Sequence, residues 1–301
     1  MKLSIHILTY NCAAHISECL ESIITQQTTF PFEIVIGDDA SLDKTSEIIK
    51  TYVAKNKNIH LKTHAKNKGI LDNFQDTLQR CQGTYIFDLA GDDYLKSSNA
   101  LQILVDELDS NPTYSFVDSG FDCYYQRSGK VSEFENKLQL ELSKEKYINR
   151  HKVYGTSLMG CCYRKSAIEK HVDFEEYKKQ NIDFEDYPIL TDLMMNTEFG
   201  LIPKVLSVYR KHRDSHSHKA NSYLIAKLYF AKKYNYSKLE LTKIYQVHEE
   251  NMLHNASLIS DKKTGRKNYK PFRQPMFRNF VYFLSSQSHL ARKVFNLFRK
   301  I

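Results

Sequence analysis

The sequence is poor in the residues that mark repetitive or fibrous proteins, with only 10 Gly and 6 Pro among its 301 residues. This scarcity argues against a low-complexity or fibrous architecture. No apolar run approaches the roughly 20 residues that a membrane-spanning helix needs. The N-terminal MKLSIHILTYN lacks a small-residue cleavage site, so we interpret it as a first strand and not as a signal peptide. The length leaves room for one large domain, or for a core domain with an appendage.

The cysteines include no C-x-x-C pair. Their scattered spacing argues against a zinc site and against a disulfide framework, which suits a reducing, cytoplasmic environment. We interpret Cys12 and Cys19 as small core residues and not as nucleophiles. The six positions are Cys12, Cys19, Cys81, Cys123, Cys161 and Cys162.

Acidic residues are absent after Asp261, whereas eleven basic residues follow it. The rest of the chain is nearly neutral, with 32 basic and 35 acidic residues, so the formal charge of +8 belongs to the C-terminal segment. The eleven are Lys262, Lys263, Arg266, Lys267, Lys270, Arg273, Arg278, Arg292, Lys293, Arg299 and Lys300.

Strand-like and helix-like segments alternate in the first half of the chain. This order predicts right-handed βαβ crossovers and a mostly parallel sheet flanked by helices, an α/β fold of Rossmann-like type. We expect strands at Lys2–Leu8, Phe32–Ile36, Ile59–Thr63, Thr84–Leu89 and Tyr114–Ser119, and helices at Ala13–Thr25, Leu42–Ala54, Leu71–Cys81 and Asn99–Leu108.

The pattern loosens after Ser119 and becomes helical near the C-terminus. We expect a hairpin around Ser128-Gly129, a strand within Gly155–Arg164 and two strands within Glu198–Arg210. Helices are expected at Leu224–Lys233 and Lys238–Ser257, and in two pieces within Pro275–Arg299. A boundary near Asp214–Ala220 would separate a domain of residues 1–219, with halves 1–119 and 120–219, from a basic helical extension of residues 220–301.

Polar side chains follow each of the first four expected strands. Because ligands of open parallel sheets bind beyond the carboxyl ends of the strands, these residues form the candidate site. They are Thr9, Tyr10 and Asn11 after the first strand, Asp38, Asp39, Ser41 and Asp43 after the second, Asn67, Lys68, Gly69 and Asn73 after the third, and Asp92 and Asp93 after the fourth.

An aromatic residue with Asp and Asn partners suits a nucleobase and its ribose, and the adjacent carboxylates of Asp92 and Asp93 suit Mg²⁺ or Mn²⁺ bridged to substrate phosphates. The residues alone also allow simpler interpretations. Gly91-Asp92-Asp93 is compatible with an ordinary turn. DDASLD is compatible with a helix start, with Asp39 or Ser41 as N-cap and Asp43 favouring the helix dipole.

Four sequence blocks, LTYN…ECLESI…Q, EIVIGDDASLDKTSEII, NKGILDNF and GTYIFDLAGDDYL, resemble the nucleotide-sugar-binding half of the inverting glycosyltransferases of family two, which have the GT-A fold and include bacterial polysaccharide enzymes. The resemblance covers Lys2 to Ser119 and continues more weakly through FEDYPI and VYRKHRDSHS. It implies a nucleotide-sugar pocket lined by Thr9, Tyr10, Asn11, Asp38, Asp39, Asn67, Gly69, Asn73 and Asp92.

The resemblance also implies a Mn²⁺ or Mg²⁺ site at Asp92, Asp93 and His212, with Asp92 as the direct ligand and Asp93 in support. Family members usually have Asp-x-Asp at this loop, and here Ala90 replaces the leading Asp, which puts the metal dependence in doubt. The catalytic base, which removes the proton of the acceptor hydroxyl, would be Asp186 in preference to Glu185. From the residues alone, a helix N-terminus, where acidic side chains are favoured, is the better interpretation of this acidic pair.

The block YRKHRDSHSH groups several cationic and imidazole side chains. The cations could meet a diphosphate, and the resemblance favours His212 as a metal ligand over the other histidines. The residues concerned are Arg210, His212, Arg213, His216 and His218.

The C-terminal segment 262–301 interleaves Lys and Arg with Phe, Tyr, Leu and Val. Such a segment suits an anionic membrane surface, with the protein peripheral on the inner face of the cytoplasmic membrane near a lipid-linked saccharide acceptor. It equally suits packing on the catalytic domain or a homodimer. We expect no nucleic acid as a partner, because no nucleic-acid motif accompanies the basic and aromatic residues.

The leading hypothesis is a transferase that moves a sugar from a nucleoside diphosphate, with UDP as the commonest carrier in the family, to a saccharide hydroxyl by an inverting single displacement. Such a reaction would serve cell-surface polysaccharide or lipopolysaccharide synthesis. The alternatives are a nucleotide-sugar-binding protein that has lost catalysis, for which Ala90 is the hint, and a nucleotidyltransferase. The nucleotidyltransferase is disfavoured because LTYNCAAHI has no glycine for a phosphate loop.

Overall fold

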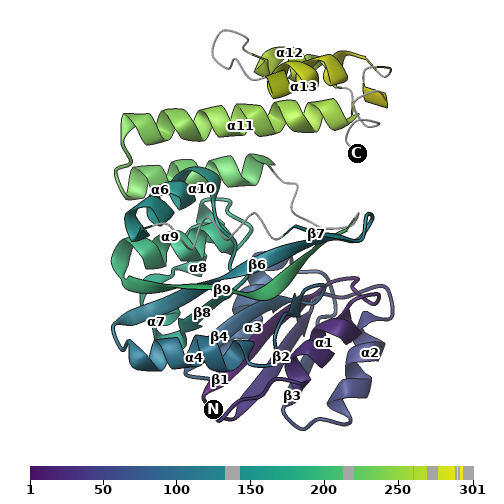
Figure 1. Cartoon of the computed structure of the whole chain (residues 1–301), viewed down its shortest axis with the longest axis vertical. Helices are drawn as coiled ribbons and strands as arrows, with labels where there is room; N and C mark the ends of the chain where they lie inside the picture. Colours follow the sequence, from purple (N-terminus) through teal and green to yellow (C-terminus); the bar gives the residue numbers. More distant parts are fainter. Residues whose placement is uncertain are drawn as a thin grey trace. The chain divides into compact units, whose positions relative to one another are not determined.

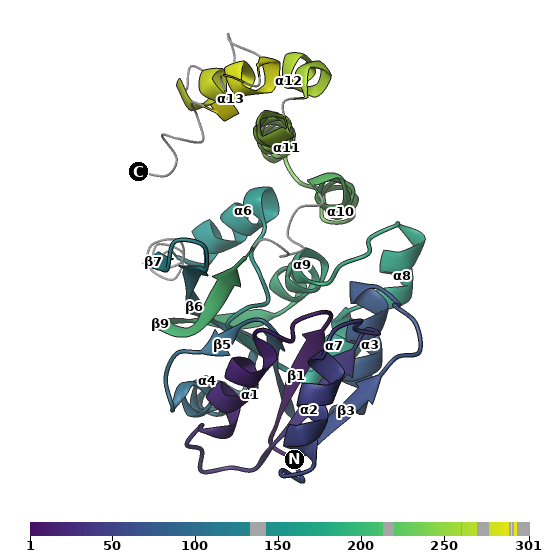
Figure 2. The same ribbon diagram turned by 90° about the vertical axis from the view of Figure 1, so that its right-hand side faces the viewer.

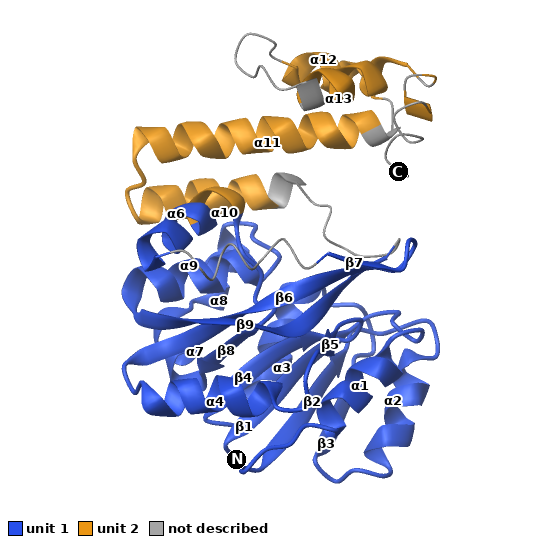
Figure 3. Ribbon diagram, viewed as in Figure 1, with its two compact units in different colours: residues 1–151, 155–217 blue, residues 152–154, 218–301 orange. Residues whose placement is uncertain are grey.

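The computed structural model describes residues 1–132, 143–212, 220–259, 261–269, 277–288, 290 and 292–293. The chain divides into two compact units, shown in Figure 3: unit 1 comprises Met1–His151 and Gly155–Ser217, and unit 2 comprises Lys152–Tyr154 and His218–Ile301. Among the described residues, no helix is both long and apolar enough to cross a membrane.

Unit 1 is built on one sheet with the strand order β3-β2-β1-β4-β8-β6-β9-β5, and β7 pairs with β6 (Figure 1). The first four strands are parallel, as the sequence predicts. They are β1 (Leu3–Thr9), β2 (Phe32–Asp38), β3 (Ile59–Thr63) and β4 (Tyr85–Ala90), and the helices between and after them are α1 (Ile16–Ile24), α2 (Thr45–Val53), α3 (Ile70–Arg80) and α4 (Ala100–Ser110).

Strand β1 is the centre of this parallel region and is covered on both faces (Figure 2). Ile5 and Ile7 belong to the core cluster that includes α1, where Ile16, Cys19, Leu20 and Ile23 form the buried stripe. His6 faces the other way and its ring lies 4.5 Å from that of Phe74 on α3. Strand β1 is therefore buried on both faces, with Ile5 and Ile7 on one face and the polar residues Ser4 and His6 on the other.

The second half of unit 1 adds antiparallel pairs, so that the α/β sheet is mixed as a whole. Strand β8 runs antiparallel to both β4 and β6, and β6 and β7 form the hairpin expected around Ser128-Gly129. These strands are β5 (Tyr94–Leu95), β6 (Tyr114–Tyr125), β7 (Lys130–Ser132), β8 (Cys161–Arg164) and β9 (Glu198–Lys211).

One expectation for this half was wrong. Residues 198–210 form one strand and not two, because Pro203 and Lys204 lie in an irregularity where the register moves from Ile202↔Ser119 to Val205↔Gly120. A proline is tolerated at such a bulge, where it need not donate to the ladder. The strand expected within 155–164 is confirmed as β8. Three helices were not predicted: α6 (Lys144–Tyr154), α7 (Lys165–His171) and α8 (Phe174–Lys179). Helix α9 (Asp186–Asn196) begins at the acidic pair, where a helix start was one of the two interpretations of the sequence.

Unit 2 is helical, as the sequence predicts for this part of the chain. Its small core brings together Val153, Ala231, Tyr236 and Ile244. The Lys152 ammonium forms a 2.9 Å ion pair with Glu240. The helices are α10 (Ala220–Lys233), α11 (Lys238–Ile259), α12 (Lys262–Asn268) and α13 (Phe277–Gln287).

Candidate functional site

The loops after β1 and β2 are joined through the carboxylate of Asp38. Thr9 Oγ1 donates to Asp38 Oδ1 over 2.9 Å, and Ser41 Oγ donates to the same oxygen over 2.5 Å. Asp38 itself is fully buried. The Asp38 carboxylate therefore ties the end of β1 to the loop after β2.

Asn11 bridges the same two loops at the surface. Its backbone N–H donates to Ser41 Oγ, and its side-chain oxygen accepts from the backbone N–H of Leu42 over 2.7 Å. Asn11 has a φ of 52°, a left-handed conformation that Asn adopts more readily than most residues. Tyr10, beside it, is partly buried.

Neither Asp39 nor Ser41 caps α2, so that interpretation of DDASLD was wrong. The helix begins at Thr45, after a loop in which Ala40 has a φ of 60°. Asp43 Oδ1 accepts from the backbone N–H of Thr45 over 2.9 Å, which places Asp43 before the first turn of α2. The loop after β2 is therefore longer than the sequence suggested, and its side chains brace other loops.

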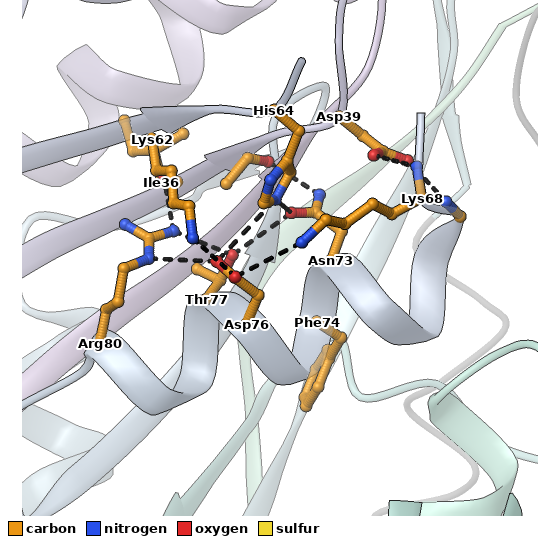
Figure 4. Close-up of polar contacts among 12 residues, drawn as sticks. Ile36, Asp39, Lys62, His64, Lys68, Asn73, Phe74, Asp76, Thr77 and Arg80 are labelled. Carbon is orange, nitrogen blue, oxygen red and sulfur yellow. Dashed lines mark hydrogen bonds and ion pairs between the residues drawn. The ribbon is translucent and has the colours of Figure 1, made fainter. Parts of the chain in front are cut away.

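Asp39 holds the loop after β3, as Figure 4 shows. Its carboxylate accepts from the backbone N–H groups of Lys68 over 2.7 Å and Gly69 over 3.0 Å. Asn67 donates to the backbone oxygen of Asp39 over 3.2 Å. Gly69 has a φ of 85°, which a glycine adopts without strain. The predicted residues Asp39, Asn67 and Gly69 are thus brought together.

Asn73 lies deeper, where α3 packs on β2 (Figure 4). Its Nδ2 donates to the Gly37 backbone oxygen over 2.9 Å, and its Oδ1 lies 3.0 Å from His64 Nε2. A Cβ on Gly37 would lie 2.4 Å from Asn73 Oδ1, so this close approach requires glycine. Asn73 is 2% exposed, and both ends of its amide are engaged in holding α3. Its side chain offers no free polar group to a nucleotide.

A cation-rich cluster on α3 and β3 adjoins this loop (Figure 4). Lys62 forms a 2.7 Å ion pair with Asp76, and Lys68 and Arg80 lie 3.6 and 3.5 Å from the same carboxylate. Burial acts to raise the pKa of Asp76, but Lys62 and Lys68 lower it overall. One carboxylate among three permanent cations leaves local positive charge beside the loop at Gly69.

The loop after β4 packs tightly against the loop after β1. A Cβ on Gly91 would lie 2.6 Å from Thr9 Cγ2 and 2.9 Å from Cys12 Sγ, so only glycine fits there. Asp92 follows, and its Oδ2 lies 2.8 Å from His212 Nε2 at the end of β9. A carboxylate and an imidazole are thereby paired across distant parts of the sequence.

Asp93 is buried, with 2% of its surface exposed. Its Oδ1 accepts from the backbone N–H of Arg210 over 2.7 Å. Burial, followed by the Asp92 charge, holds the pKa of Asp93 well above the ordinary value. Asp93 therefore ties the loop to β9 beneath Asp92.

Arg210 holds this loop from the other side. Its Nε donates to the backbone oxygen of Asp92 over 2.9 Å, and one terminal nitrogen lies 2.5 Å from Glu18 Oε2. The guanidinium also lies over the rings of Tyr94 and Tyr124, at 5.2 and 5.3 Å from their centroids. Nothing in the sequence indicated that Glu18 would take part.

Glu185 and Asp186 stand at the start of α9, so the helix N-terminus interpretation is confirmed, but neither side chain caps α9. Asp186 Oδ1 accepts from the backbone N–H of Leu158 over 3.4 Å. Burial, opposed by hydrogen bonds from Leu158 and Glu185, raises the pKa of Asp186 to about 6. Burial and the neighbouring Asp186 raise the pKa of Glu185 well above its ordinary value.

The acidic pair interacts electrostatically with the loop after β4. The charge of Asp186 contributes to the raised pKa of Asp93. A carboxylate whose pKa is raised to about 6 thus interacts with Asp93, which follows Asp92 directly in the sequence.

The sequence reasoning also missed His15, which lies just before α1. Its ring centroid is 5.0 Å from that of His212. Burial, together with Arg210 and His212, lowers the pKa of His15. Its position after the first strand was the only available signal. The predicted positions Arg213, His216 and His218 lie outside the described residues.

Residues 4–172 match the family model described as "Glycosyl transferase family 2". An uncharacterised protein of Mycobacterium tuberculosis is 28% identical over 220 residues, which are 72% of this chain and 61% of that protein. The chain thus spans less than two thirds of the length of this relative.

Two solved structures share the fold. S. aureus TarS in complex with UDP-GlcNAc aligns with a TM-score of 0.60 and 20% identity, over 97% of this chain and 83% of that one. The mannosyltransferase PcManGT from Pyrobaculum calidifontis, in complex with GDP-Man and Mn²⁺, aligns with a TM-score of 0.57 and 17% identity, over 100% of this chain and 88% of that one.

Proposed function

The chain belongs to glycosyl transferase family 2, and from that premise we propose that it transfers a sugar from a nucleoside diphosphate to a saccharide hydroxyl with inversion. The observation that carries the proposal is the pairing of Asp92 with His212 in the same neighbourhood as Asp186. We place the reaction on the cytoplasmic side of cell-surface polysaccharide synthesis, with a saccharide or lipid-linked saccharide as acceptor.

The nucleotide would bind across the loops after β1, β2 and β3. Tyr10 and Asn11 supply a ring face and an amide at the rim, while Asp38 and Asp39 brace the loops below them. The adjoining cluster of Lys62, Lys68 and Arg80 favours an anionic ligand. A UDP-sugar is the first donor to test, since TarS is seen with UDP-GlcNAc.

The residues present fit a divalent cation only as a partial shell. Among the described residues, no group of three or more His, Cys, Asp and Glu side chains could hold a metal ion by itself. Asp92 and His212 would supply one oxygen and one nitrogen, with Asp93 in support, and donor phosphates would complete the coordination, as is common for Mg²⁺ and Mn²⁺. A bound ion would neutralise the departing diphosphate.

Asp186 is the proposed base. It would accept the proton of the acceptor hydroxyl as that oxygen attacks the anomeric carbon, and the bond to the diphosphate oxygen breaks in the same displacement. A pKa of about 6 leaves most Asp186 carboxylates ionised at neutral pH and still basic enough to accept a proton. Glu185, whose pKa burial raises well above its ordinary value, would donate a hydrogen bond to Asp186 and hold its orientation.

The test is a release assay for free nucleoside diphosphate with a panel of UDP-, GDP- and dTDP-sugars, with and without Mn²⁺. Thermal unfolding with the same donors reports binding independently of turnover. We expect one donor class to stabilise the chain and to be consumed faster with Mn²⁺. No stabilisation and no release with any donor would refute the proposal.

A second candidate is a donor-binding protein without turnover, and Ala90 is the observation that favours it. This residue ends β4 with an exposed side chain at the place where a further carboxylate is expected. The two candidates differ in one result: the second predicts donor-dependent stabilisation with no release of diphosphate in the presence of acceptor extracts.

A further inference from the structure

The last forty residues carry a strong positive charge. Residues 262–301 contain eleven Lys or Arg and no Asp or Glu. No other part of the chain has a comparable imbalance, and the proposed transfer reaction makes no use of it. A basic segment of this length favours binding to partners of the opposite charge.

Helices α12 and α13 form a compact pair within unit 2. The Asp261 carboxylate caps α12 by accepting from the backbone N–H groups of Lys263 and Thr264. Gly265 allows the helices to approach closely, because a Cβ there would lie 1.9 Å from Ser286 Oγ. The ring of Tyr269 stacks on that of Phe283 with centroids 4.3 Å apart. We call this pair the α12–α13 platform.

The platform exposes several cations. Lys262, Lys263 and Lys267 are exposed on α12. The charge of Lys263 helps to lower the pKa of Asp261, which is the only acidic residue that adjoins them in the sequence. Arg266 donates through Nε to the amide oxygen of Gln287, which leaves its charge without a carboxylate among the described residues. The cations are therefore available to an external anion.

Apolar side chains are exposed on the same platform. Phe280 and Leu284 are 44% and 42% exposed, and they lie one turn apart on α13. Leu290, just beyond α13, is 72% exposed. Residues spaced by four positions share one side of a helix, so Phe280 and Leu284 form a continuous apolar strip.

We propose that the α12–α13 platform docks on an anionic lipid surface. The ammonium groups of α12 would meet the phosphates of the headgroups, and Phe280 and Leu284 would enter the boundary with the acyl chains. A bilayer fits both features, since it presents uniform negative charge over a wide area with apolar material directly beneath. A compact acidic protein would satisfy the charge but would need an apolar patch of matching shape.

The experiment is flotation of the full chain with vesicles of phosphatidylcholine containing phosphatidylglycerol, compared with pure phosphatidylcholine. We expect binding to the anionic vesicles only, weakening as salt is added. The variant Lys262→Gln/Lys263→Gln/Lys267→Gln should bind on the order of 100-fold more weakly, because each lysine near an anionic surface contributes roughly five-fold. The variant Phe280→Ser/Leu284→Ser should bind the anionic vesicles about 10-fold more weakly.

Matched controls separate these effects from general changes in charge or apolar surface. Lys50→Gln/Lys55→Gln/Lys57→Gln removes three exposed lysines from unit 1 and should leave binding unchanged. Leu239→Ser/Tyr245→Ser removes two exposed apolar side chains of α11 and should also bind normally. Replacing Lys262, Lys263 and Lys267 by Arg should retain binding, which guards against a folding defect in the Gln variant.

Several results would overturn the proposal. The full chain could fail to float with anionic vesicles at low salt, or float equally well with neutral ones. The α12 lysine variant could bind as tightly as the unaltered chain. Light scattering could show that Phe280→Ser/Leu284→Ser converts a dimer into a monomer with vesicle binding intact, which would assign the apolar strip to a second copy of the chain.

Discussion

Nε2 of His212 lies 2.8 Å from Oδ2 of Asp92, although 120 residues separate them in the sequence. Strands β4 and β9 bring the two side chains together, and each would give one donor atom to a divalent cation. Replacing His212 by Gln should therefore raise the Mn²⁺ concentration that gives half-maximal turnover. We expect a rise of at least about 10-fold, because losing even an outer partner of a metal site typically costs that much affinity.

His60→Gln is the control for this experiment, because His60 is exposed on β3 and its only described ionic contact is a 3.7 Å approach to Glu33. Its Mn²⁺ dependence should match that of the unaltered chain. If His212→Gln shows the same Mn²⁺ midpoint as the control, His212 does not bind the metal.

Asp186→Asn should remove the base without removing the donor site. We expect turnover to fall by roughly 10²- to 10⁴-fold, the contribution usual for a general base. Thermal stabilisation by the donor should persist, because Asp186 lies outside the nucleotide loops. Donor binding together with full turnover in Asp186→Asn would show that another group takes the proton.

The pH dependence of turnover tests the coupling of Glu185 to Asp186. The base must be ionised, so kcat/KM should fall as pH drops below about 6, the raised pKa of Asp186. A hydrogen bond from Glu185 lowers that pKa, and Glu185→Ala should therefore move the acidic limb to higher pH. Glu185→Gln keeps a donor and should move it less. If the acidic limbs of Glu185→Ala and Glu185→Gln fell at the same pH, Glu185 would not donate a hydrogen bond to Asp186.

The positions of Thr9, Asp39, Asn67 and Asp92 were predictable because each follows a strand of the parallel half. Alternating strands and helices determine which sheet edge these residues share, and periodicity is a local property of the sequence. The start of α2 at Thr45 was not predictable from the Asp and Ser residues before it. Their side chains instead bond to loops after other strands.

The role of Arg210 could not be read from the sequence, because it depends on contacts with Glu18 and Asp92 at separations of 192 and 118 residues. Asn73 illustrates the same limit, since its burial against β2 is a consequence of how α3 packs. Residue type and motif position indicate which loops form the site. Packing determines which side chains in those loops remain available to bind a ligand.

Asp93 should destabilise the fold as pH rises. The pKa of Asp93 is higher in the folded state than in the unfolded state. Its contribution to the free energy of unfolding is therefore fully present below the unfolded-state pKa, and it is lost as pH rises through the folded-state pKa. Asp93→Asn keeps an oxygen for the Arg210 N–H and cannot ionise. Its Tm should exceed that of the unaltered chain at about pH 8, with the difference narrowing at about pH 5. A constant difference across this range would contradict the burial argument.

Arg210→Lys should loosen the loop that carries Asp92. A lysine cannot bond Asp92 and Glu18 together, and losing hydrogen bonds from a charged donor should lower the free energy of unfolding by about 2 kcal/mol in urea titrations. Glu18→Gln is the control: the Glu18 side chain is 55% exposed, so its loss should cost less than about 1 kcal/mol. The Mn²⁺ midpoint should also rise in Arg210→Lys and stay constant in Glu18→Gln. Equal stability losses in the two variants, with unchanged midpoints, would mean that Arg210 does not position Asp92.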